Sequence, residues 1–292
     1  MNNIQSDNFD EKINLISSLI NAEKYSLALD LLAEFYKQYN HIWGCENKKT
    51  IYCEFVLAQL NIAVGDIHKA KYYYEISIPK IISNDGFGDD FVIEAQIVYI
   101  RFLITDKDYA YAISCLEKLH MQLKICIENN VRDYLTVIDL LSSLYSVEGF
   151  HQKSVDMTCE MIAILMEEHE HRYGNILTKD NIDFSKEVID KLISLHLDAG
   201  ASFSRLEKYH DAKQYLEHGY FLSFNVYGDH DERSLKLNYN LAVNEMQGID
   251  PKEGIRQLHF VYEDMVKYLG SDNEYTKKAY NTLKMVDEIK EN

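Results

Sequence analysis

Apolar and polar residues alternate along this chain with the spacing of amphipathic helices. From Phe91 to Ile104, apolar side chains recur every three or four residues, as in a helix with one buried stripe. A polar stretch at 105–108 interrupts the pattern, and a second run with the same spacing follows from Tyr109 to Leu123. The pattern predicts two helices joined by a tight turn, and no segment alternates with the two-residue period of a strand.

The same pattern returns at a fixed step of 42 positions, and each return is marked by a small residue. The small residues are Ala28, Ala70, Ala112, Ser154, Ala212 and Gly254, and only the step from Ser154 to Ala212 is longer, at 58 positions. Two antiparallel helices approach closely only where one side chain is small. A fixed period in the range of about 20–50 residues is typical of a solenoid of stacked units.

Two further positions of each repeat are expected in the core, and one in the turn. The core positions are Leu32, Tyr74, Leu116, Thr158, Leu216 and Leu258, four residues after the small one, and Leu15, Leu57, Tyr99, Leu141, Ala199 and Leu241, thirteen before it. The turn position holds Glu23, Gly65, Lys107, Gly149, Glu207 and Ile249. Only two of these are the glycines expected at a helix end.

The repeats predict a single domain over 1–292. We expect hairpins at about 10–40, 50–83, 91–128, 133–170, 184–225 and 232–269, and a last helix at 274–290. Leu283 lies one full step beyond Leu241, so this last helix repeats the first half of a unit, as a terminal cap does. The extra residues fall at about 169–182 and form either a loop on one face or a bend between two halves.

Particular residues of these units resemble the tetratricopeptide repeat (TPR). The resemblance rests on Leu57-Ala58, on Leu241-Ala242 and on the segment 65–70 with an aromatic residue or leucine four positions later, and it covers nearly the whole chain. The 42-residue length, the absence of a proline that closes the second helix and the segment 227–242 are similar to the kinesin light chain type. The resemblance implies an all-α, right-handed superhelical solenoid of about six TPR-type hairpins with a C-terminal capping helix.

Charge and composition exclude several classes of partner. Lys and Arg total 30 against 47 Asp and Glu, a formal net charge of −17 that repels nucleic acid. The N-terminus lacks the pattern of a signal peptide, and no stretch is apolar enough to span a membrane, so we expect an acidic cytoplasmic protein. About nine residues precede the first hairpin, so we expect no DNA-binding domain. The five cysteines form no CxxC pair and are expected to be reduced.

Motifs for catalysis or cofactors are not found in the sequence. GxGxxG, GxxxxGK[ST], HExxH and GxSxG do not occur, and the Gly-containing segment 86–90 follows no predicted strand. The histidines of HisGluHis at 169–171 point to different faces of a helix and are not expected to bind a metal. We therefore expect no enzyme, no cofactor and no metal site.

The resemblance to the TPR implies that the first helices line a concave groove. The candidate groove residues are Phe55, Gln59, Arg101, Thr105, Ser143, Arg205, Tyr239, Asn240, Asn244 and Gln247. The asparagine amides could hold a peptide backbone by paired hydrogen bonds. Arg101 and Arg205 are either anchors for an acidic or C-terminal segment or internal salt bridges to a neighbouring repeat.

The expected function is a non-catalytic scaffold or adaptor that binds a protein or peptide in this groove. Two alternatives stay open. The first is a peptide-sensing regulator that resembles bacterial cytosolic TPR receptors and lacks a DNA-binding domain. The second is a secreted or host-directed effector, because one fold serves many functions.

Overall fold

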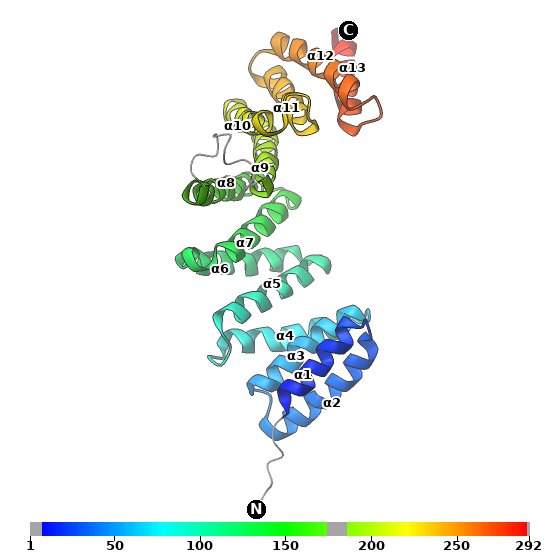
Figure 1. Cartoon of the computed structure of the whole chain (residues 1–292), viewed down its shortest axis with the longest axis vertical. Helices are drawn as coiled ribbons and strands as arrows, with labels where there is room; N and C mark the ends of the chain where they lie inside the picture. The colour runs from blue at the N-terminus through cyan, green and yellow to red at the C-terminus, as the bar shows by residue number, and fades with distance from the viewer. Residues whose placement is uncertain (1–7, 174–185, 291–292) are drawn as a thin grey trace, which may run out of the picture. The chain divides into compact units, whose positions relative to one another are not determined.

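The computed structural model describes residues 8–173 and 186–290, which form thirteen helices and no strand (Figure 1). The prediction of an all-α helical repeat solenoid is confirmed. The chain divides into two compact units, Met1–Ile125 and Cys126–Asn292, and each is described by itself. That one continuous array runs through both units stays a prediction.

Unit 1 contains three helical hairpins. They are α1 (Phe9–Asn21) with α2 (Tyr25–Trp43), α3 (Lys48–Ala63) with α4 (Ile67–Ser83), and α5 (Asp89–Thr105) with α6 (Tyr109–Ile125). The second helix of one hairpin packs on the first helix of the next, α2 on α3 and α4 on α5. The core of the unit therefore lies between the helices of each hairpin and between successive hairpins.

Unit 2 contains three hairpins and a last single helix. They are α7 (Ile127–Val147) with α8 (His151–Tyr173), α9 (Lys186–Arg205) with α10 (Tyr209–Tyr227), and α11 (Glu232–Gly248) with α12 (Pro251–Tyr268), followed by α13 (Glu274–Lys290), which packs on α12. Of the predicted insertion at 169–182, residues 169–173 complete α8. Its other residues, and the side chains of HisGluHis at 169–171, lie outside the described part of the chain.

The small residues of the repeat lie in the core, as the sequence predicts. Ala28, Ala70, Ala112 and Ala212 are fully buried, and Leu32, Tyr74, Leu116, Leu216 and Leu258, four residues after a small one, are buried as well. In the fourth hairpin the small residue is Ser154, whose Oγ donates to the Ser142 carbonyl at 2.8 Å. Ser142 Oγ donates to the Ser154 carbonyl at 3.1 Å, so the two helices are also joined by hydrogen bonds at their crossing.

One predicted core residue is exposed. Leu15 is 49% exposed, whereas the next residue, Ile16, is 1% exposed. Tyr99, the counterpart of Leu15 in the third hairpin, packs its ring against Tyr74 of the preceding hairpin. No helix precedes α1 in the described chain, so α1 buries the side that faces α2, where Ile16 lies.

The turns inside the hairpins adopt a left-handed backbone at five repeat-equivalent positions. Gly65 and Gly149 have φ of +83° and +79°, and Glu23, Lys107 and Glu207 have φ of +57°, +62° and +59°. The Asp108 N–H donates to the Leu103 carbonyl at 2.9 Å, the bond that closes a Schellman motif at a helix end. The sequence thus places three side chains where only glycine has no steric cost.

Lys107→Gly should raise the free energy of unfolding by about 1 kcal/mol, because it removes the Cβ clash of a left-handed residue. Lys107→Ala keeps the Cβ and serves as the control, with little expected change. Urea unfolding of the two variants measures both effects. A glycine variant no more stable than the alanine variant would contradict the assignment of this turn.

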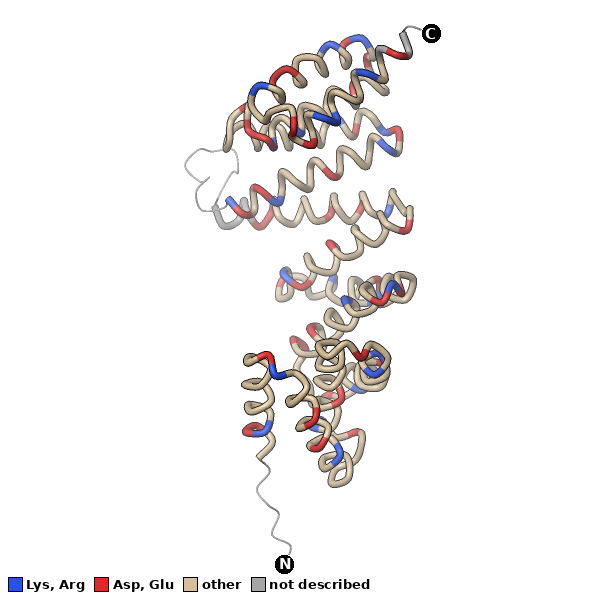
Figure 2. The backbone as a smooth tube through the Cα atoms, turned by 90° about the vertical axis from the view of Figure 1, so that its right-hand side faces the viewer, with Lys and Arg blue, Asp and Glu red and all other residues tan. Residues whose placement is uncertain are grey.

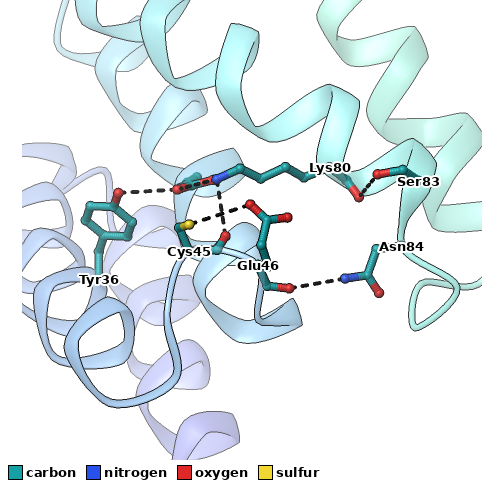
Figure 3. Close-up of polar contacts among 7 residues, drawn as sticks. Tyr36, Cys45, Glu46, Lys80, Ser83 and Asn84 are labelled. Atoms are coloured by element: carbon teal, nitrogen blue, oxygen red, sulfur yellow. Dashed lines mark hydrogen bonds and ion pairs between the residues drawn. The ribbon is translucent and has the colours of Figure 1, made fainter.

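A buried carboxylate joins the first two hairpins. Glu54 on α3 is 1% exposed, and Lys80 Nζ on α4 donates to its two oxygens at 3.2 and 3.0 Å. The Tyr36 hydroxyl on α2 donates to Oε1 at 3.2 Å. Lys80 also donates to the Cys45 carbonyl at 3.2 Å, and Figure 3 shows Lys80 reaching from α4 towards Tyr36 and Cys45. Burial raises the pKa of the Glu54 carboxyl, while Lys80 and Tyr36 oppose that rise.

Charged side chains are spread along the helices of both units. Figure 2 shows acidic and basic residues interspersed along the chain rather than gathered on one helix. None of the helices in the described ranges combines the length and the apolar character that crossing a bilayer requires.

Candidate functional site

A polar pocket of about 470 Å³ lies in unit 2 between the first helices of two successive hairpins, α9 and α11. We call it the α9–α11 groove. Its lining residues are Ala201, Ser204, Arg205, Glu207, Tyr209, Asn240, Val243 and Gln247. Three of the ten residues predicted from the sequence, Arg205, Asn240 and Gln247, therefore lie together.

Arg205 provides the positive charge of the groove. It is the last residue of α9, and its side chain is exposed. Within the described chain it forms no ion pair, so the salt bridge to a neighbouring repeat that the sequence left open is not present there. An exposed guanidinium keeps all its N–H donors available and can bind a carboxylate through two parallel hydrogen bonds.

Two amide side chains face the same space from α11. Gln247 is exposed, and Asn240 is half-buried. The Asn240 Nδ2 donates to the Lys236 carbonyl at 2.8 Å, which leaves one N–H and the Oδ1 acceptor for another partner. A donor and an acceptor on one amide are what an extended peptide backbone requires.

Asn244 does not serve as a ligand group, contrary to the prediction. It is 1% exposed, its Oδ1 accepts from Ser204 Oγ at 2.6 Å, and its Nδ2 donates to the Tyr209 carbonyl at 2.9 Å. Because both ends of the amide are satisfied by α9 and by the start of α10, Asn244 holds the wall of the groove in place instead of binding in it.

Tyr239 faces α13 and does not line the α9–α11 groove. Its hydroxyl shares a hydrogen bond of 3.1 Å with Thr282 Oγ1, and its ring meets Tyr275 edge-on, with the centroids 6.1 Å apart. Neighbouring helix positions are about 100° apart, so Tyr239 and Asn240 point to different partners.

Of the predicted groove residues in unit 1, one lies in the core and three are exposed. Phe55 is 5% exposed and packs its ring against Tyr74 and Phe91, so it is a core residue and its assignment to the groove was wrong. Gln59, Arg101 and Thr105 are exposed, and the Thr105 hydroxyl donates to the Arg101 carbonyl at 3.0 Å. Like Arg205, Arg101 has no ion pair with the rest of the described chain.

Ser143, on α7 of unit 2, is exposed and is not among the residues that line the α9–α11 groove. The sequence-based site residues missed Glu207 and Tyr209, because they follow the first helix and the prediction was confined to first helices. Ala201 and Arg205 are spaced by four residues, as are Val243 and Gln247, and this helical spacing is the signal that could have found the rest of the lining.

The described residues offer no set of three His, Cys, Asp or Glu side chains placed to hold a metal ion. The groove itself combines one guanidinium, one carboxylate and several amide and hydroxyl groups, with no nucleophile next to a base. These groups can bind a ligand through hydrogen bonds and charge.

Comparisons with known proteins show the fold. No protein-family model and no curated protein sequence matches the chain. A putative kinesin light chain structure with nearly identical TPR-like repeats, from Podosopora anserina, aligns with a TM-score of 0.54 and 12% identity, over 75% of this chain and 96% of that chain. A second crystal structure of those repeats gives a TM-score of 0.53 at 12% identity, over 74% and 94%.

A signal transduction ATPase with a tetratricopeptide repeat sensor, from Pyrococcus horikoshii, aligns with a TM-score of 0.52 and 14% identity, over 98% of this chain and 40% of that chain. The chain is therefore a TPR-like helical repeat solenoid, similar in fold to the kinesin-light-chain-like repeats that its sequence resembles.

Proposed function

We propose that this chain is a non-catalytic binding protein that holds an extended peptide segment in the α9–α11 groove. The observation that carries the proposal is the exposed, unpaired Arg205 next to the amides of Asn240 and Gln247. Arg205 would bind a carboxylate of the ligand, either an acidic side chain or the C-terminus. Asn240 would bind the ligand backbone.

The fold supports this role. TPR-like solenoids expose extended surfaces between stacked helices and bury little that resembles a catalytic cleft. The similar protein from Pyrococcus horikoshii carries its tetratricopeptide repeats as a sensor. For this chain we infer the same general use of the repeats, recognition, with a peptide as the ligand.

The groove can be tested with an array of short peptides, each printed once with a free C-terminal carboxylate and once amidated. We expect binders to carry a free C-terminus or an acidic residue. Arg205→Ala should then weaken binding by about 1.5–3 kcal/mol, as loss of a hydrogen bond to a charged group does. Titration calorimetry with the best peptide gives this value.

Arg101→Ala is the matched control, because Arg101 is also exposed and forms no ion pair within the described chain but lies in unit 1. It should leave the affinity unchanged. Neither substitution should change the melting temperature by more than a degree or two, since neither arginine forms an ion pair within the described chain and the attraction of Arg205 to Asp198 acts over a longer distance. Equal binding of amidated peptides, or equal effects of the two substitutions, would contradict the proposed role of Arg205.

A further inference from the structure

A second pocket, of about 510 Å³, lies in unit 1 and is formed by the second helices α4 and α6 over α5. We call it the second-helix pocket. Its floor is buried, because Tyr99 and Ile100 of α5 are 5% and 1% exposed. Its rims are open, because Ile82 of α4 and Tyr111 of α6 are 49% and 48% exposed. Large apolar side chains on both rims of a pocket with an apolar floor mark an interaction site.

Two opposite charges line this pocket, one on α4 and one on α6. Glu75 on α4 and Lys118 on α6 both line it, both are exposed, and neither forms an ion pair within the described chain. Burial raises the pKa of the Tyr99 hydroxyl, and the nearby Tyr111 and Glu75 raise it further. Burial also raises the pKa of the Cys115 thiol, while Tyr111 and Lys118 oppose the rise. Glu75 also raises the pKa of Tyr111 and so lies near it, whereas Lys118 follows Tyr111 by seven residues on α6, about two helical turns.

The length of the pocket corresponds to about two turns of a helix. The lining residues run from Tyr74 to Ile82 on α4 and from Tyr111 to Lys118 on α6. At a rise of about 1.5 Å per residue, each wall is about 10–12 Å long. A partner helix presents apolar residues at i, i+3, i+4 and i+7 over the same length.

A repeat-equivalent pocket in unit 2 has different chemistry. It has a volume of about 450 Å³ and is lined by residues of α10, α11 and α12. Leu241, Gln257 and Phe260 there occupy the repeat positions of Tyr99, Cys115 and Lys118. Its walls also carry Asp264 and an ion pair of 3.0 Å between Lys213 and Glu245. Glu217 keeps the acidic position of Glu75 in that pocket, so the cation Lys118, which Phe260 replaces, distinguishes the pocket of unit 1 from its counterpart.

We propose that the second-helix pocket docks an amphipathic helix of a partner protein. The apolar side of that helix covers Tyr99 and Ile100, a basic residue pairs with Glu75, and an acidic residue about two turns away pairs with Lys118. This interface is separate from the α9–α11 groove and does not depend on the peptide proposed for it.

The probe is a phage-displayed library of 14-residue helices in which one face is randomised. We expect the enriched helices to carry apolar residues at i, i+3 or i+4, and i+7, with a basic residue at one end and an acidic residue at the other. Tyr111→Glu and Ile82→Glu should each weaken the binding of a selected helix at least tenfold. Phe260→Glu, at a 57% exposed position of the equivalent pocket, is the control and should change it less than twofold.

Charge reversal tests the orientation. The double variant Glu75→Lys, Lys118→Glu should bind the selected helix at least tenfold more weakly and should regain affinity for a helix with its two terminal charges exchanged. Circular dichroism confirms that each variant is folded, which is expected because all four positions are exposed.

Three results would overturn the proposal. The first is a library that enriches no helix, or helices whose binding ignores Tyr111→Glu. The second is Tyr111-dependent binding of the small aromatic anion 1-anilinonaphthalene-8-sulfonate without any helix binding, which would make the pocket a small-molecule site. The third is a dimer in sedimentation that Tyr111→Glu dissociates, which would assign the surface to a second copy of the chain.

Discussion

Lys80→Met should lower the free energy of unfolding by about 3–5 kcal/mol, because it leaves the buried Glu54 carboxylate without its cation. The Lys80 side chain is 20% exposed and that of Glu54 is 1% exposed, so water cannot replace the lost partner. The Tyr36 hydroxyl alone would remain on the carboxylate. Since domains are stable by about 5–15 kcal/mol, such a loss is a large share of the total.

The effect of Lys80→Met should depend on pH in a defined direction. Burial raises the pKa of Glu54 in the folded chain above its value in the unfolded chain. The folded state then binds the proton more tightly, so stability falls as the pH rises from the unfolded pKa to the folded pKa. Removing Lys80 raises the folded pKa further. In urea unfolding experiments, the difference in free energy of unfolding between the parent and Lys80→Met should therefore be largest near neutral pH. It should shrink towards about pH 4.

Lys71→Met is the matched control for Lys80. Lys71 Nζ lies 3.1 Å from Asp106 Oδ2, but the side chains are 38% and 28% exposed. Exposed pairs contribute about 0–1 kcal/mol, so this substitution should change stability little. Adding Glu54→Gln to Lys80→Met should recover much of the loss, because no buried charge then lacks a partner. Equal losses for the two lysines would contradict the buried ion pair.

The core was predictable from the sequence because the same close contact between two helices recurs in six repeats. A small residue that returns at a fixed step has one physical explanation, a close helix crossing, and its burial in hairpin after hairpin follows from that. Leu15 is exposed although its repeat position predicts burial. Burial at this position requires a preceding hairpin, and α1 is the first helix of the described chain. The sequence does not predict the left-handed backbone of the turns at Glu23, Lys107 and Glu207, because none of these residues favours that conformation.

The groove was only partly predictable, because helical spacing assigns a face and not a partner. Asn240 and Asn244 are spaced by four residues and share a face of α11. The amide of Asn244 is hydrogen-bonded at both ends, to Ser204 and to Tyr209, whereas Asn240 keeps one N–H and its Oδ1 for another partner. That difference depends on residues about 35–40 positions away in the chain. No periodicity reports such contacts.

The division into two units also has no signal in the repeat. The regular step continues without a change from Ala112 to Ser154. Non-helical backbone angles occur at Cys126 (φ −126°, ψ 35°) and at Asn130 (φ −133°, ψ 29°). No glycine or proline stands nearby, so the usual signs of a break are missing from the sequence between α6 and α7.

Gly254 is the one glycine among the six small residues of the repeat, and the backbone of a neighbouring helix explains it. A Cβ added at Gly254 would fall within the van der Waals radii of the Met246 backbone N and Cα. At Gly200, an added Cβ would instead meet first the side chain of Leu216. A side chain can rotate away, whereas backbone atoms move only if α11 and α12 separate.

Gly254→Ala should therefore destabilise the chain by about 2–3 kcal/mol, although alanine alone would favour a helix by about 1 kcal/mol. Gly200→Ala gains the same helix propensity and should cost less, because its closest contacts are side-chain atoms of Leu216 and the nearest backbone atom, the Ala212 oxygen, lies at 3.3 Å. Urea unfolding of the two variants gives both numbers. If Gly254→Ala were as stable as the parent, α11 and α12 would not cross as closely as described, and the glycine would need another explanation.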